Sequence, residues 1–192
     1  MSNIWIEERL IAGSLAQVDT YTVSTAAASI IIGGGSSSSS GIDFAINTDD
    51  VYMLTYTNWQ GSVNDKKPYM RVTESGSANT GNNYNFSGRK LKTYSANQNG
   101  YAYNQAQAKL SDENIGDQDQ ETANGVMYFY NANNSSEFTF WTTENVNRDG
   151  GGNLMSMTGG GAFRVASAVD GMQFYMESGN IVSGTFTLYK VV

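Results

Sequence analysis

The chain has 192 residues, of which 40% are hydrophobic, 12% aromatic and 15% charged. This composition fits one globular domain, because disordered chains usually combine high charge with few aromatic residues. The sequence contains neither cysteine nor histidine. It therefore excludes disulfides, thiolate or histidine-ligated zinc sites, and nucleophiles activated by histidine. Catalysis by a pair of carboxylates, as in glycosidases, stays open, although nothing in the sequence selects such a pair.

The formal net charge of −7 disfavours nucleic-acid binding, since phosphate contacts need a basic surface. The charge is unevenly spread. Residues 66–92 hold six basic side chains and one acidic side chain, whereas residues 97–124 hold five acidic side chains and one basic side chain. Two solvated faces are the ordinary interpretation, and complementary patches between neighbouring copies are the alternative. The first nine residues do not resemble a signal peptide, and no apolar run approaches the ~18 residues of a membrane span.

Alternation of apolar and polar residues at period two predicts strands along most of the chain. In chain order we expect strands at residues 4–11, 29–32, 41–47, 51–58, 69–74, 89–95, 126–131, 137–142, 162–166, 171–177 and 183–192. Residues 75–88 are expected to form a long loop, 104–110 a short helix and 178–180 a turn. Phe138 and Phe140 share one face of their strand, and Trp141 lies on the other.

Many short strands separated by Gly and Asn turns predict an all-β fold, a jelly-roll-like antiparallel β-sandwich with long Gly/Ser/Asn-rich loops. We expect a single domain over residues 1–192. The tract at 33–40 (GGGSSSSS) has the composition of a linker, but the 32 residues before it are too few to form a core. It is therefore predicted to be a mobile loop, and residues 97–124 a polar, acidic insertion.

Few residues suggest a binding site. Asp117, Asp119 and Glu121 alternate in a pattern that only weakly resembles a calcium loop, and a solvated loop is the simpler interpretation. Trp59 and Trp141 could stack on sugar rings, although aromatic side chains of β-sandwiches more often pack in the core. No glycine run continues into a phosphate-binding motif.

Both ends of the sequence resemble virion proteins of tailed bacteriophages. The run from Val169 to Lys190, VDGMQFYMESGNIVSGTFTLYK, resembles their closing strand, turn and final strand, and Trp5–Ile11 is similar to their opening. The strand that begins at Asp50 resembles one in the same group. Lys190, where that group usually has glycine, and the tract at 33–40 are the departures. The resemblance implies a jelly-roll module of the capsid-decoration, head-fibre or tail-fibre-tip type.

The resemblance further implies a non-enzymatic structural protein on the virion surface, made in the host cytoplasm. A capsid decoration (cement) protein that stabilises the shell through oligomeric contacts is the first hypothesis, and a fibre module that binds host glycan is the alternative. The expected partners are the major capsid protein or other virion proteins, and further copies of the chain, with a trimer favoured. We expect no cofactor, metal, nucleic acid or membrane. The candidate partner contacts are Ile4, Trp5, Ile6, Lys66, Lys67 and Arg71; Trp5 could equally cap the core.

Overall fold

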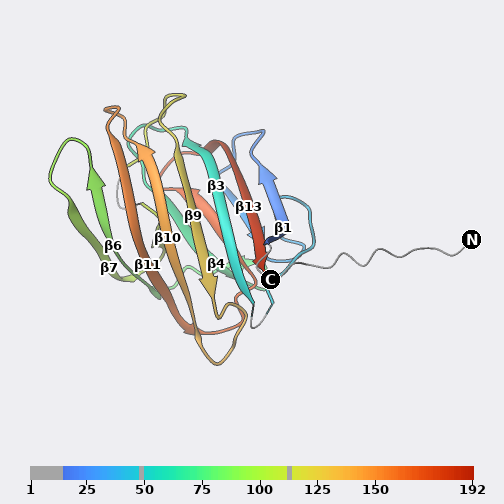
Figure 1. Ribbon diagram of the computed structural model, residues 1–192. Helices are drawn as coiled ribbons and strands as arrows, with labels where there is room; N and C mark the ends of the chain where they lie inside the picture. Colours follow the sequence, from blue (N-terminus) through green and yellow to red (C-terminus); the bar gives the residue numbers. More distant parts are fainter. Residues whose placement is uncertain (1–14, 48–49, 112–113) are drawn as a thin grey trace, which may run out of the picture.

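The computed structural model of the chain describes residues 15–47, 50–111 and 114–192 (Figure 1). Every regular element within these ranges is a strand, so no helix there could cross a membrane. The strand predicted at 4–11, with the candidate contacts Ile4, Trp5 and Ile6, lies outside the described residues.

The described residues form thirteen strands. Their bounds are β1 Leu15–Thr22, β2 Ser29–Gly33, β3 Val51–Gly61, β4 Pro68–Glu74, β5 Ser77–Ala78, β6 Tyr84–Lys92, β7 Gln98–Gln105, β8 Ala108–Lys109, β9 Ala123–Tyr130, β10 Phe138–Arg148, β11 Leu154–Ala166, β12 Gly171–Met176 and β13 Ile181–Val191.

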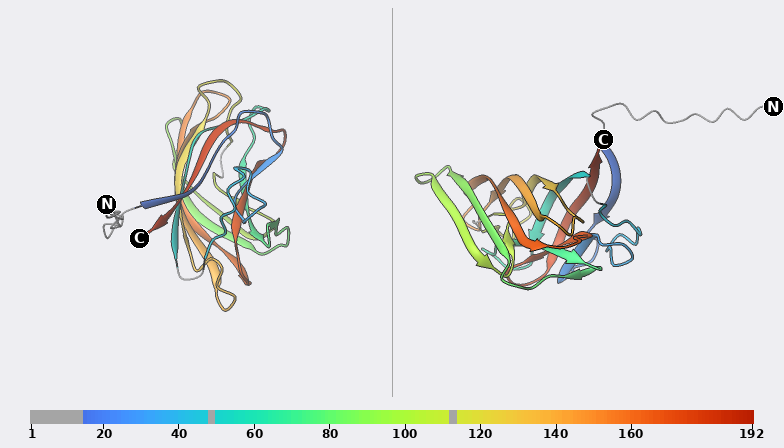
Figure 2. Two further views of the ribbon diagram at one scale, coloured as in Figure 1. Left: turned by 90° about the vertical axis from the view of Figure 1, so that its right-hand side faces the viewer. Right: turned by 90° about the horizontal axis from the view of Figure 1, so that it is seen from below.

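The strands form two antiparallel sheets that pack face to face as a sandwich. The larger sheet has eight strands in the order β1-β13-β3-β9-β10-β11-β6-β7. The smaller sheet has the order β2-β12-β4-β5, and β8 also pairs with β4. Figure 1 looks onto the larger sheet, and the left view of Figure 2 shows the two layers edge-on. The predicted all-β, antiparallel sandwich is confirmed.

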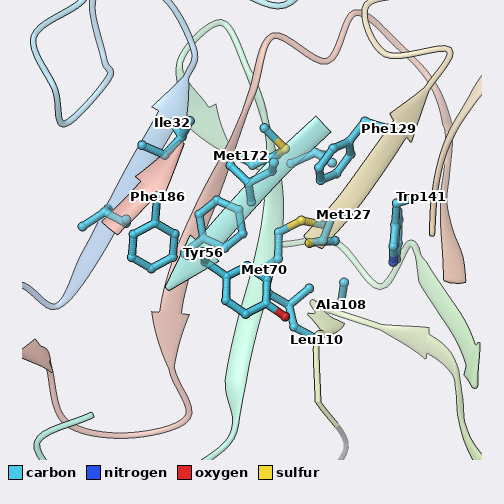
Figure 3. Packing of buried hydrophobic residues seen from close by; sticks show 14 of the residues in the cluster. Ile32, Tyr56, Met70, Ala108, Leu110, Met127, Phe129, Trp141, Met172 and Phe186 are labelled. Carbon is cyan, nitrogen blue, oxygen red and sulfur yellow. The ribbon is translucent and has the colours of Figure 1, made fainter. Parts of the chain in front are cut away.

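Side chains from both sheets fill one hydrophobic core (Figure 3). Met172 and Phe174 of β12 meet Tyr56, Phe129 and Phe186 of the larger sheet, and all five are at most 1% exposed. The period-two patterns of β3, β12 and β13 thus point their apolar faces inward, as the sequence predicts.

The less regular segments differ from the sequence-based expectations. Residues 41–47 form no strand; Phe44 makes a single bridge to Gly35. The helix predicted at 104–110 is wrong, because these residues end β7 and form β8. Asn104 has a φ of 52°, which an α-helix does not tolerate. Residues 75–88 are not one long loop, since they include β5 and the start of β6.

The serine-rich tract, predicted to be a mobile loop, is held by a buried carboxylate. Asp19 is fully buried, and its Oδ2 accepts hydrogen bonds from the Gly33 amide at 2.8 Å and from the Ser38 hydroxyl at 2.7 Å. Ser39 donates its amide to the Ile31 carbonyl at 2.8 Å. A buried carboxylate needs such donors, so the tract is fixed beside β1 and β2.

Candidate functional site

Trp59 and Trp141 lie in the core, which confirms the interpretation that such aromatic side chains pack inward; the alternative, that they stack on sugars, is wrong. They are 0% and 2% exposed. The Trp59 ring packs 5.1 Å from the ring of Phe186 and 5.9 Å from that of Phe174. Strand β10 turns Trp141 toward the smaller sheet and Phe140 toward solvent, because successive side chains point to opposite faces.

Of the basic residues predicted as partner contacts, Arg71 lies on β4 of the smaller sheet, and Lys66 and Lys67 directly precede that strand. Their backbones or side chains are engaged within the chain. Lys66 exchanges backbone hydrogen bonds with Ile115, and the carbonyl of Lys67 accepts the Glu177 amide at 2.8 Å. The Arg71 guanidinium lies 4.7 Å from the centre of the Tyr175 ring.

The basic run does not form one surface patch. Arg89, Lys90 and Lys92 lie on β6, in the other sheet, so the six basic residues of 66–92 are divided between the two layers. The alternative of complementary charged patches between neighbouring copies therefore lacks the single basic face that it requires.

The acidic segment at 117–121 does not converge on a cation site. Glu121 is buried, and its Oε2 accepts the Gln118 amide at 3.2 Å, whereas Asp119 is exposed. Within the described ranges, no group of three or more acidic side chains could hold a metal ion.

The outer face of the larger sheet, turned away from the core, has two halves of different character, one without charged side chains and one with exposed aromatic rings. On the outer face of β1, β13 and β3, which we call the threonine half, none of the twelve side chains is charged. Two threonine pairs join neighbouring strands: Thr20 to Thr187 at 2.9 Å and Thr22 to Thr185 at 3.0 Å between their Oγ1 atoms. The members are Leu15, Gln17, Thr20, Thr22, Val51, Met53, Thr55, Thr57, Thr185, Thr187, Tyr189 and Val191.

The other half of the same face is hollow. One row of the register runs Tyr128, Thr142, Gly160, Ser87, Tyr101 across β9, β10, β11, β6 and β7. In this row, aromatic rings stand on the outer strands and small residues cover the three strands between them. In the adjacent row, Phe140 stands on β10. At about 4.8 Å per strand, the two tyrosine backbones lie about 19 Å apart. We call this hollow the trough.

The glycine run 159–161 gives the trough its floor. A Cβ at Gly160 would lie 2.6 Å from the Trp141 carbonyl oxygen, and one at Gly161 would lie 2.3 Å from the indole ring of Trp141. Since real Cβ atoms do not approach so closely, these positions require glycine, which lets β11 press against β10.

Three depressions follow one another along β11 at the trough. The first, of about 290 Å³, borders Leu154 and Ser156. The second, of about 480 Å³, borders Tyr128 and Thr158, and the third, of about 440 Å³, borders Phe140 and Ala162. The three depressions thus follow one another in sequence order along β11.

Neither half of the outer face was identified from the sequence. The relevant signal is the alternation in 137–142, which separates Phe138 and Phe140 from Trp141 but does not say which side faces the core. Comparisons with protein-family models, curated proteins and solved structures found no match to this chain.

Proposed function

We propose that the chain is a non-enzymatic structural protein of a bacteriophage virion that docks on the shell as a decoration (cement) protein. The resemblance of residues 169–190 supports this placement. In the fold, these residues reach from just before β12 to near the end of β13, two strands that lie within their sheets. The observation that carries the proposal is the threonine half, a surface over three strands without a charged side chain.

A charge-free surface suits a permanent contact. The buried centres of protein interfaces are depleted of charged residues, because each charge would lose its hydration on docking. The paired threonine hydroxyls already restrain one another, so docking costs little further side-chain entropy. Shell lattices are symmetric, so each copy would contact identical neighbours. We therefore expect a homo-oligomer, with a trimer favoured.

Edge strand β1 gives the threonine half one open border. An edge strand presents unpaired amide and carbonyl groups that a neighbouring chain can bind. Residues 1–14, with Ile4, Trp5 and Ile6, precede this strand directly in the sequence, so we keep these residues as proposed contacts. Arg71 lies on the opposite sheet, with Lys66 and Lys67 just before its strand β4, so these three residues would need a second partner surface.

The test is co-sedimentation with shells of the same phage that lack the protein. We expect the wild-type protein to oligomerise and to sediment with the shells. Combined Gln17→Glu and Thr57→Glu substitutions, at two exposed positions of the threonine half, should abolish sedimentation. Ser77→Glu, at an exposed position of the smaller sheet, is the matched control and should sediment normally. A wild-type protein that neither oligomerises nor sediments would contradict the proposal.

A further inference from the structure

We propose that the trough binds an extended, uncharged glycan chain. The site lies on β9, β10, β11, β6 and β7, apart from the threonine half, so it stays accessible when the threonine half is docked. It also differs from the predicted sugar contact at Trp59 and Trp141, whose rings are buried.

The rings along the trough are exposed beyond what core packing requires, and Tyr103 also holds the Arg164 guanidinium 5.0 Å from its ring centre. Tyr101 is 80% exposed and Tyr103 is 64% exposed, while Phe140 and Tyr128 are 44% and 36% exposed. Large apolar side chains gathered on one surface mark a binding site rather than a stabilising contact. An aromatic ring offers a broad flat face on which the C–H face of a sugar ring can pack.

The floor between the rings offers hydrogen-bonding groups. Thr142, Thr158 and Ser87 are exposed, and their side chains make no hydrogen bond to another described residue. A hydroxyl both donates and accepts, as each sugar hydroxyl does. Flat apolar walls and small hydroxyls on the floor together match the two kinds of surface that a sugar ring presents.

The charge of the trough selects an uncharged ligand. The row next to the tyrosines runs Val126, Glu144, Thr158, Arg89, Asn99, so one carboxylate and one guanidinium balance each other. The same face also carries Arg164, whose guanidinium lies 5.0 Å from the centre of the Tyr103 ring, and Lys92 borders the first depression. These few cations do not make the dense basic surface that an anionic polymer such as nucleic acid or a polyuronate needs. A neutral polysaccharide imposes no such requirement.

The shape of the trough selects a chain rather than a single sugar. The three depressions border residues 154 to 162 of β11 in sequence order. The eight steps from residue 154 to residue 162 span about 27 Å at about 3.4 Å per step. Depressions distributed over that length offer contacts to several sugar units of one chain lying along the strand.

The experiment is native affinity electrophoresis of the purified full-length protein through gels that contain a soluble polysaccharide. The neutral probes are dextran, galactomannan, xyloglucan and mixed-linkage glucan, and polygalacturonate is the acidic comparison. We expect at least one neutral probe, and not polygalacturonate, to retard the protein. Tyr128→Ala and Tyr101→Ala should each weaken that binding at least about tenfold, the loss of one good contact. Ser87→Tyr, which fills the floor, should abolish it.

Tyr189→Ala is the matched control, since Tyr189 lies in the same register row but on the threonine half. It should leave polysaccharide binding unchanged, and melting temperatures should show that every variant is folded. The proposal is overturned if no neutral probe retards the protein, or if Tyr128→Ala and Ser87→Tyr bind as wild type does. It is also overturned if these two variants lose shell sedimentation instead, because the trough would then be a protein interface.

Discussion

The threonine half and the trough belong to one face of one sheet, and the same register rows cross both, yet one is flat and the other hollow. In the threonine half, β-branched side chains of equal size stand opposite each other, as Thr20 does opposite Thr187. In the trough, Gly160 and Ala162 leave the middle strand almost bare. Side-chain size at a few register positions therefore decides whether a sheet face forms a docking surface or a groove.

The inner side of the sheet shows the same dependence. Trp141 packs against β11 where Gly161 has no side chain, so one glycine run both hollows the outer face and makes room for a core indole. Changes on the inner side should accordingly affect stability, and changes on the outer side should affect binding.

The largest effect should come from the inner side of the trough. Trp141→Ala should lower the free energy of unfolding by about 3–5 kcal/mol, because it removes a fully buried ring and leaves a cavity. Phe140→Ala, one residue away on the outer side, should cost less than about 1 kcal/mol. Chemical denaturation measures both, and equal losses would contradict the assignment of the two faces.

Gly161→Ala should be next, with a loss of about 1–3 kcal/mol. Its Cβ would meet the Trp141 ring and the Asn85 carbonyl oxygen, so the strand or the indole must shift. Ala162→Ser, on the outer side of the same strand, is the control and should change stability by less than about 0.5 kcal/mol. Thermal melting of both variants measures these changes in stability. A Gly161→Ala protein as stable as wild type would show that the close approach of β11 to Trp141 is absent.

High pH should lower the stability of the fold through two buried tyrosines, one behind each half. Burial raises the pKa of the Tyr56 hydroxyl behind the threonine half and of the Tyr84 hydroxyl behind the trough. In the unfolded chain these hydroxyls ionise near pH 10, so above that pH only the unfolded state releases their protons, and stability falls as pH rises. Each tyrosine contributes up to about 1.4 kcal/mol per pH unit in this window.

The melting temperature between pH 9 and pH 11 tests this expectation. Tyr56→Phe removes one ionisable group and should make the fall shallower. An equally steep fall in the Tyr56→Phe protein would mean that Tyr56 is not buried as described.

The smallest effect should come from the threonine half. Replacing both Thr20 and Thr187 by Val removes a hydroxyl pair and leaves no unpaired partner, so stability should stay within about 0.5 kcal/mol of wild type. A single Thr187→Val substitution leaves Thr20 without its partner and is the comparison. A double variant that loses more than about 2 kcal/mol would show that this half is a stabilising element rather than a free docking surface.

The sequence was sufficient where a strand has one apolar face and one polar face. Leu54, Phe174 and Leu188 are buried as their period-two patterns predict. The sequence was insufficient where the buried face of a strand is polar. Strand β10 extends to Arg148, beyond the apolar run that predicted it, and the inward-pointing residues of this extension are Asn145 and Asn147. The glycine run of β11 likewise has the composition of a loop but is paired on both sides.

The candidate site depended on information that no local pattern contains. Tyr101 and Tyr128 are 27 positions apart in the sequence, and only the pairing of five strands places them on opposite walls of one trough. Tryptophan was the natural choice for a sugar contact because of its large ring. That same size favours burial, and the outer face uses tyrosine and phenylalanine instead.

The decisive measurement compares the two outer-face variants in both assays, shell co-sedimentation and affinity electrophoresis with polysaccharide. We expect Gln17→Glu with Thr57→Glu to lose shell sedimentation and keep polysaccharide binding, whereas Tyr128→Ala should lose polysaccharide binding and keep sedimentation. The reverse pattern, or the loss of both activities in either variant, would contradict the assignment of separate roles to the two halves.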